Sequence, residues 1–343
     1  MTPHLLRGAA LIGPALLAIA CGNGVSSPGT GPSAIPTATP VAANTRSVQF
    51  TAFLDENGNR TLDANELVRI PNIEVVVGGA RGQTSSITGQ ATLQITEGSQ
   101  TLDVTPASLP PFYRPPAANS ISIPASGPVM IPITLQVGSN RPTVYMAFGD
   151  SITNGEPEVG DMNGYRLILQ TMLRNHFGAA TVANEGVDST RSRAGAERIG
   201  DSLSRVRPAF TLIHYGTNDW NDSACSDLPC FTTDSLRSMV RQINQSGGHA
   251  FLATILPTNT GYDDRAPASR NDWVAQQNVY IRQVADQEGA VLVDLNGAFY
   301  RSGIPFPSLF VDHVHPTAPG YQIMAETWFN AITKAYSKIL ADY

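Results

Sequence analysis

Four segments between residues 149 and 315 of this 343-residue sequence carry residue types that could do chemistry together. Ser151, Gly186 and Asn218 each follow a short apolar run, and Asp312 and His315 lie three residues apart near the C-terminus. A serine hydroxyl becomes a good nucleophile only when a neighbouring base takes its proton, and a histidine oriented by a carboxylate is a common base. On one helical turn, Asp312 and His315 would share a face. These residues therefore predict acyl transfer through a serine.

Such a reaction also needs hydrogen-bond donors for the negative charge that develops on the carbonyl oxygen. We expect the backbone N–H groups of Ser151 and Gly186 and the side-chain amide of Asn218 to supply them. Each residue has an ordinary alternative, namely a helix N-cap for Ser151 and turn positions for the other two. Their occurrence together, in this order, favours the catalytic interpretation.

The elements that must position these residues are strands that alternate with longer amphipathic segments. Predicted strands cover 143–148, 181–184, 210–215, 250–255 and 290–294, and predicted helices cover 165–177, 194–206, 233–246, 271–288 and 319–340. This alternation indicates a parallel sheet covered on both faces, which binds ligands beyond the carboxyl ends of its strands. The candidate residues fall at those ends.

Together these segments resemble the ordered sequence blocks of the SGNH hydrolases, also called the GDSL-type lipase/esterase family. The blocks are Gly149-Asp150-Ser151, Asn184-Glu185-Gly186, Gly216-Thr217-Asn218-Asp219 and Asp312-His313-Val314-His315. The resemblance implies a three-layer α/β/α flavodoxin-like domain over 141–343, with Ser151 as nucleophile, Asp312 and His315 completing a catalytic triad, and Gly186 and Asn218 as oxyanion donors. It also implies a serine esterase that needs no cofactor for catalysis. Small-molecule or carbohydrate esters, such as acetylated carbohydrates, would be its substrates.

Three nearby residues are weaker candidates for these roles. The literal string Gly-Asp-Ser-Leu occurs at Gly200–Leu203, but we expect Ser202 to lie on a helix, far from the carboxyl edge of the sheet. His313 lacks the three-residue spacing from Asp312, and His214 is expected to be a satisfied core or edge histidine. We expect Asp150 to support the turn before Ser151. No Gly-x-Ser-x-Gly sequence is present, which argues against the α/β-hydrolase fold.

Two other functions remain open at this level. The same triad could pass the acyl group to another hydroxyl, as in SGNH-type O-acyltransferases. The chain could instead be a cell-surface binding lipoprotein whose hydrolase domain is inert.

A region of different character precedes the hydrolase-like segment. Short β-branched or alternating runs at 47–53, 73–77, 90–95, 120–123 and 129–135, punctuated by Gly and Pro, predict a small all-β sandwich over 47–140. Within it, residues 55–66 place oxygen-bearing side chains at the spacing of an EF-hand-type calcium loop. The expected calcium ligands are Asp55, Asn57, Asn59, Thr61, Asp63 and Glu66. The loop resembles the calcium-binding B-type β-sandwiches of bacterial surface proteins, although Arg60 stands where Gly is usual, and a solvated acidic turn is the alternative.

The N-terminus predicts export. Residues 1–21 combine a cation, an apolar run too short to span a bilayer and a lipobox-like end, so we expect a lipoprotein signal peptide and lipidation of Cys21. A plain secretory signal is the alternative. Residues 22–46 are rich in Gly, Ser, Pro, Thr and Ala, and they predict a disordered tether. The expected location is the bacterial cell envelope, at the outer membrane or cell surface, or the exterior after secretion.

Composition limits the partners of this chain. Its formal net charge of −6, without a Lys/Arg cluster, argues against nucleic acid as a partner. We expect a monomer that touches the membrane only through its lipid anchor. Setting Cys21 aside leaves Cys225 and Cys230, which we expect to form a disulfide in an oxidising compartment.

Overall fold

The computed structural model describes residues 44–155 and 164–335, which belong to one unit of the chain, Ala43–Tyr343. The predicted signal peptide, Cys21 and nearly all of the predicted tether lie outside the described residues. Among the residues that are described, no helix is both long enough and apolar enough to cross a membrane.

The first part of the described chain is built from β-strands. They are β1 (Thr45–Leu54), β2 (Glu74–Val77), β3 (Ala80–Gln83), β4 (Gln90–Thr96), β5 (Gly98–Val104), β6 (Tyr113–Arg114), β7 (Asn119–Ile123) and β8 (Val129–Leu135). They form two four-stranded sheets, in the orders β4-β1-β8-β6 and β3-β2-β5-β7. Five strands lie where the sequence predicts them. The polar strands β3, β5 and the two-residue β6 were not predicted.

The second part is a five-stranded parallel sheet with helices. Its strands are β9 (Arg141–Gly149), β10 (Thr181–Gly186), β11 (Pro208–His214), β12 (His249–Ala253) and β13 (Val291–Val293). The strand order is β10-β9-β11-β12-β13. The helices are α1 (Ser151–Asn154), α2 (Gly164–Phe177), α3 (Ser192–Val206), α4 (Phe231–Gln245), α5 (Ala268–Glu288), α6 (Leu295–Arg301), α7 (Phe306–Leu309) and α8 (Ala318–Thr333). The order reverses between β9 and β11, so a crevice is expected beyond their carboxyl ends.

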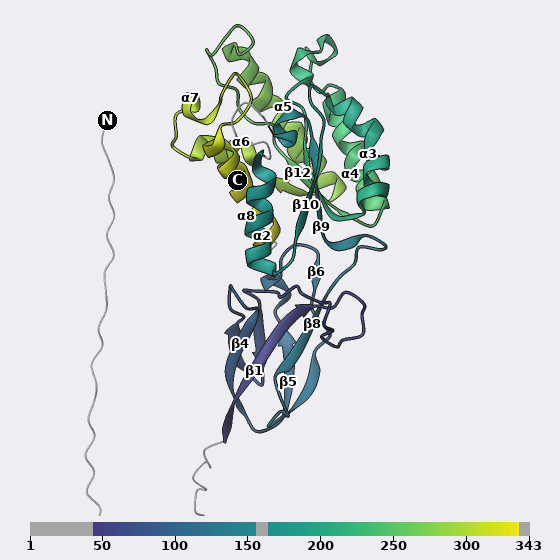
Figure 1. The fold of residues 1–343 in the computed structure, drawn as a ribbon, viewed down its shortest axis with the longest axis vertical. Helices are drawn as coiled ribbons and strands as arrows, with labels where there is room; N and C mark the ends of the chain where they lie inside the picture. Colours follow the sequence, from purple (N-terminus) through teal and green to yellow (C-terminus); the bar gives the residue numbers. More distant parts are fainter. Residues whose placement is uncertain (1–43, 156–163, 336–343) are drawn as a thin grey trace, which may run out of the picture. The chain divides into compact units, whose positions relative to one another are not determined.

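Both faces of the parallel sheet are covered by helices (Figure 1). Successive side chains of a strand point to opposite faces, and β9 shows the consequence. Val144, Met146 and Phe148 pack in the cluster that includes α3, α4 and α5, whereas Tyr145 and Ala147 pack in the cluster that includes α2 and α8. A strand buried on both faces reads as a continuous apolar run, which is why β9 was predictable.

The last helix is shorter than predicted. Tyr321, Met324, Trp328 and Ile332 form its buried stripe, as expected, but α8 ends at Thr333 because Lys334 has an extended backbone. The rest of the predicted helix, after residue 335, lies outside the described residues. The short helices α1, α6 and α7 were not predicted, because they have too few turns to show a periodic pattern.

Candidate active site

Ser151 lies at the point where β9 ends and α1 begins. Asp150 caps this helix, since its Oδ1 accepts a hydrogen bond of 3.0 Å from the Ile152 N–H. A Cβ at Gly149 would lie 2.2 Å from Thr153 Oγ1 and 2.4 Å from the His214 carbonyl oxygen, so the turn has no room for a larger residue. The nucleophile candidate is therefore held on a tightly packed turn at the carboxyl edge of the sheet.

The structure joins Ser151, His315 and Asp312 in one hydrogen-bonded chain. Ser151 Oγ lies 2.9 Å from His315 Nε2, and His315 Nδ1 lies 2.8 Å from Asp312 Oδ2. The side chains of His315 and Asp312 are 20% and 26% exposed, so these hydrogen-bonded side chains are partly buried but still accessible to solvent. Serine and histidine are 164 residues apart in sequence, and the fold alone brings them together.

The segment that carries Asp312 and His315 is a loop, not the helical turn that we predicted. Asp312 Oδ1 accepts bonds of 2.7 Å from the backbone N–H groups of both Val314 and His315, so the carboxylate folds the loop around itself. This leaves Oδ2 free for the imidazole of His315. Burial by itself would raise the pKa of Asp312, but the hydrogen bonds from His315 and Val314 hold that pKa well below its usual range. Asp312 is therefore a carboxylate at neutral pH.

A second segment holds this loop in place. The backbone N–H of Asn259 donates to the His313 carbonyl at 3.0 Å, and its side-chain amide donates to the Asp312 carbonyl at 3.3 Å. The buried Arg270 donates to the carbonyl oxygens of Thr217 and Arg265, at 3.0 and 2.9 Å. Neither Asn259 nor Arg270 was singled out in the sequence, because only the fold places them beside the loops that carry Asp312 and Thr217.

Two of the predicted oxyanion donors already make hydrogen bonds within the protein. The Gly186 N–H donates to Asn184 Oδ1 at 3.0 Å, and Asn218 Nδ2 donates to the Thr190 carbonyl at 3.1 Å. A Cβ at Gly186 would lie 2.2 Å from the Asn154 nitrogen, so α1 and the end of β10 touch through their backbones. Ser189, in the loop after β10, has a φ of 60°, which presents its peptide in an orientation uncommon for a residue other than glycine.

The weaker candidates lie outside the hydrogen-bonded chain. Ser202 is buried on α3, and its Oγ donates to Glu185 Oε2 at 2.8 Å, so it lies nearer the strand ends than we predicted. His313 Nδ1 lies 3.7 Å from Asp312 Oδ2 and has no hydrogen-bond partner among the described residues. His214 is fully buried, but neither ring nitrogen has a partner there, so the prediction of a satisfied histidine is wrong. Burial lowers the pKa of His214 to about 4.

Asp150 is more than a turn residue. It is fully buried, and its Oδ2 has no hydrogen-bond partner among the described residues. Burial raises the pKa of Asp150 to about 7, against an opposing contribution from the Ile152 N–H. Its carboxyl group can therefore change protonation state near neutral pH, one residue before the candidate nucleophile.

A disulfide joins Cys225 and Cys230, as predicted. It closes the segment between η3 (Asp219–Asn221) and α4, and the indole of Trp273 donates to the Cys225 carbonyl at 2.9 Å. The bridged segment comes shortly after Asn218 in the sequence, so the disulfide restrains the loop beside this candidate oxyanion donor.

The predicted calcium loop folds back on itself through its own polar groups. Asp63 Oδ2 accepts bonds of 2.7 and 2.8 Å from the side-chain amides of Asn57 and Asn59. Asp55 and Glu66 are buried and accept backbone N–H groups. Arg60 has a φ of 62°, the left-handed conformation for which glycine is usual. Within 44–155 and 164–335, no three His, Cys, Asp or Glu side chains are grouped to hold a metal ion, and calcium binding stays a prediction.

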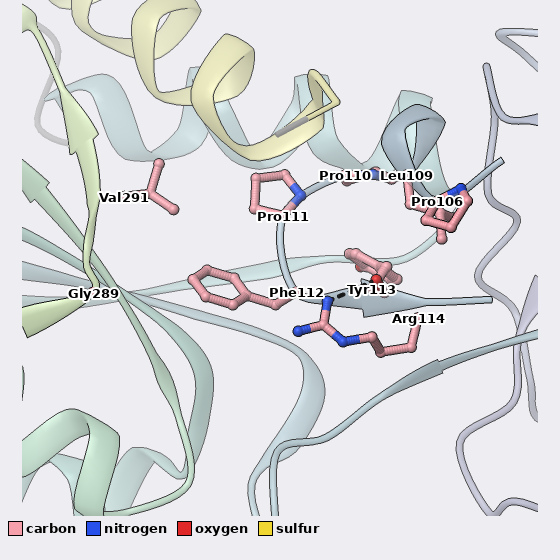
Figure 2. A pocket seen from close by; sticks show the side chains of 9 residues that line it. All are labelled: Pro106, Leu109, Pro110, Pro111, Phe112, Tyr113, Arg114, Gly289 and Val291. Carbon is pink, nitrogen blue, oxygen red and sulfur yellow. Dashed lines mark hydrogen bonds between the residues drawn. The ribbon is translucent and has the colours of Figure 1, made fainter. Parts of the chain in front are cut away.

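A cavity of about 250 Å³ lies away from these residues. Figure 2 shows its lining of prolines and aromatic side chains from segment 106–114, together with Gly289 and Val291 at the start of β13. Phe112 stacks on His249 there, with ring centroids 4.0 Å apart. The cavity faces the amino ends of the parallel strands, whereas Ser151 follows a carboxyl end, so it takes no part in the candidate site.

Comparison with known proteins gives a family match and several relatives. Residues 147–323 match the GDSL-like Lipase/Acylhydrolase family. A multidomain esterase of Ruminococcus flavefaciens is 24% identical over 254 residues, which cover 62% of this chain and 31% of that protein. The chain thus spans about a third of the length of that relative.

Solved structures also match, among them these two. An alpha/beta hydrolase enzyme from the metagenome of Lake Arreo, Spain, is 22% identical with a TM-score of 0.47, covering 58% of this chain and 98% of that one. An acetylxylan esterase from Geobacillus stearothermophilus is 23% identical with a TM-score of 0.46, covering 58% of this chain and 96% of that one.

Proposed function

Because the chain belongs to the GDSL-like lipase/acylhydrolase family and so to the class of carboxylic ester hydrolases, we propose that it cleaves esters through an acyl-serine intermediate on Ser151. The observation that carries this proposal is the hydrogen-bonded chain from Ser151 through His315 to Asp312. Nucleophile, base and orienting carboxylate stand in the order that acyl transfer requires.

The proposed reaction follows from the geometry. His315 Nε2, 2.9 Å from Ser151 Oγ, takes the hydroxyl proton as the oxygen attacks the carbonyl carbon of the ester. The same nitrogen then gives this proton to the departing alcohol, which leaves the acyl group on Ser151. A water molecule then attacks the acyl carbonyl carbon as His315 takes its proton, the bond to Ser151 Oγ breaks to release the acid, and His315 returns the proton to Ser151 Oγ. Asp312 orients the imidazole and stabilises its cation in both steps.

The oxyanion would be held by donors beside Ser151. The Ser151 N–H and the Asn218 amide keep the roles predicted for them. Gly186 can serve only if its N–H gives up the bond to Asn184 Oδ1. Asn218 has a second amide hydrogen besides the one that it donates to the Thr190 carbonyl.

We propose that the chain has two domains, which follow an N-terminal export signal. Residues 47–140 would be an all-β sandwich with a calcium loop, and 141–343 a three-layer, flavodoxin-like hydrolase domain. The two four-stranded sheets and the separate parallel sheet support this division. Signal peptide, tether and lipidated Cys21 complete the proposal.

Acetylated carbohydrates are the substrates we propose, since the matched acetylxylan esterase is named for such a substrate. Hydrolysis of acetyl, butyryl and longer acyl esters, and of acetylated xylan, should be measured for the wild type and Ser151→Ala. A fluorophosphonate probe should label Ser151 in the wild type alone. Equal turnover by both proteins would refute the proposal, and transfer to an added sugar would identify an acyltransferase instead.

A further inference from the structure

Arg198 is a charged side chain that the proposed reaction does not use, yet it reaches the backbone of the candidate site. It lies on α3, and its side chain is 23% exposed. The guanidinium carbon lies 4.0 Å from the centroid of the Phe148 ring, so it rests on the last aromatic side chain of β9. A cation over an aromatic face is attracted by the ring quadrupole, which fixes the position of the guanidinium group.

One nitrogen of this group contacts the ends of three adjacent strands. Arg198 Nη2 lies within donating distance of the Gly149 carbonyl on β9, at 3.1 Å, and of the Glu185 carbonyl on β10, at 2.7 Å. It also lies 2.7 Å from the hydroxyl of Tyr215, which follows β11. The next residues along the chain lead to Ser151, Gly186 and Asn218 respectively, the nucleophile candidate and the candidate oxyanion donors.

The contact at Tyr215 extends to Asn218 through a second hydrogen bond. The Tyr215 hydroxyl lies 3.2 Å from Thr190 Oγ1, and the Thr190 carbonyl accepts from Asn218 Nδ2 at 3.1 Å. The side chain of Glu185 accepts hydrogen bonds from Ser202 and Arg205 on the same helix, and Arg198 Nη1 also lies 3.8 Å from its Oε2. Arg198 and Arg205 therefore both pair with this carboxylate, but Arg198 also contacts the backbone of the strand ends.

We propose that Arg198 is a positioning residue for the esterase, which fixes the three strand ends so that nucleophile and oxyanion donors keep one geometry. This inference rests on the proposed function. A charged donor strengthens its hydrogen bonds, and an oxyanion site is effective only when its donors are oriented before the reaction. Loss of Arg198 should therefore weaken binding of the transition state more than binding of the ester.

The test compares Arg198→Met with Arg205→Met, a matched control on the same helix. Arg198→Met keeps an apolar stem over Phe148 but removes the donors. Its kcat for an acetyl ester should fall ~10- to 100-fold, less than the roughly 10²- to 10³-fold cost of removing an oxyanion donor itself, because the donors stay present but lose orientation, with KM changed less than about threefold. Fluorophosphonate labelling of Ser151 should slow by a similar factor. Arg198→Lys should recover part of the loss, and Arg205→Met should stay within about threefold of wild type in kcat.

Two further measurements separate the possible outcomes. Circular dichroism and melting curves should show that Arg198→Met is folded at the assay temperature. Backbone amide hydrogens of residues 186–190 should exchange with solvent faster in this variant than in the wild type. An unchanged kcat, or equal losses in Arg198→Met and Arg205→Met, would overturn the proposal. Failure of the esterase assignment itself would appear differently, as turnover by wild type that Ser151→Ala does not remove.

Discussion

At the scale of single residues, the site depends on which of two neighbouring histidines reaches the serine. Both ring nitrogens of His315 form hydrogen bonds, Nε2 with Ser151 and Nδ1 with Asp312. His313 Nδ1 lies 3.7 Å from the same carboxylate and donates no hydrogen bond to it. Because Asp312 folds the loop through backbone bonds, the two imidazoles are held in different positions.

We therefore expect His315→Ala to lose ~10³-fold or more in kcat/KM, because nucleophile and base act as a unit. His313→Ala should lose less than about tenfold. Steady-state kinetics on an acetyl ester, with circular dichroism to verify folding, would compare the two variants. If His313→Ala were the more damaging change, the assignment of the base would be wrong.

A second residue-scale prediction concerns Asp150 and pH. Its pKa is raised by burial from the ordinary 3.8 to about 7 in the folded chain. The folded state thus binds the proton more tightly, so the contribution of Asp150 to stability is complete below pH 4 and is lost as pH rises to 7. At 1.36 kcal/mol per unit, this effect is at most ~4 kcal/mol.

Asp150→Asn keeps an oxygen for the Ile152 N–H but cannot ionise. The unfolding free energy of this variant, relative to wild type, should be higher at pH 7.5 than at pH 4.5. Urea denaturation at both values provides the measurement. A difference that does not change with pH would show that Asp150 does not titrate in this window.

At the scale of elements, loops after the strands matter more than the strands themselves. The segment 219–231 leads from Asn218 into α4, and the Cys225–Cys230 bridge closes part of it. Trp273 on α5 binds this segment through its indole N–H and packs edge-on against Trp220. The loop beside Asn218 is thus fixed by a covalent and an aromatic contact.

Replacing both cysteines with serine should reduce the unfolding free energy by ~2 kcal/mol, the loop-closure value for so short a loop. Denaturant unfolding of wild type and double variant, with and without reductant, would measure the change. Reductant should destabilise the wild type and leave the double variant unaffected. Equal stability of all four samples would contradict the prediction.

At the scale of the whole molecule, two predictions concern segments far from Ser151 in sequence. The loop 55–66 carries buried carboxylates at Asp55 and Glu66, with amides of Asn57 and Asn59 turned toward Asp63. Calcium bound only to the folded state would stabilise it by mass action. Millimolar calcium should raise the melting temperature of the full chain relative to the chain in chelator.

Glu66→Ala should abolish this shift. Glu326→Ala, which removes a carboxylate from α8 outside the loop, should preserve it. Calorimetric titration with calcium would show the binding directly. No heat of binding and no thermal shift in the wild type would leave the solvated acidic turn as the correct interpretation.

Anchoring is the other whole-molecule prediction. If Cys21 is lipidated, Cys21→Ser should move the protein from the membrane fraction of a bacterial host to the soluble fraction. Cys225→Ser, which removes a cysteine elsewhere, should leave the distribution unchanged. Wild-type protein found only in the soluble fraction would favour the plain secretory signal.

The sequence by itself determined the elements that rest on local patterns. Apolar runs predicted β9 to β13, helical periodicity predicted the long helices, and the blocks at Ser151 and Asp312–His315 identified residues that the structure joins. The cysteine pair was likewise found by counting. Each of these signals consists of residues that are close in sequence, because burial and catalysis require particular side chains at those positions.

Only the tertiary structure decided how distant residues meet. Strand β5 pairs with β2 and β7, neither of which is next to it along the chain, and β3 is a polar edge strand paired only with the adjacent β2, so no apolar run marks either strand. The loop around Asp312, the bond that occupies the Gly186 N–H, and the reach of Arg198 to three strand ends were equally hidden. Backbone carbonyls carry no sequence information, so contacts made to them appear only when the chain has folded.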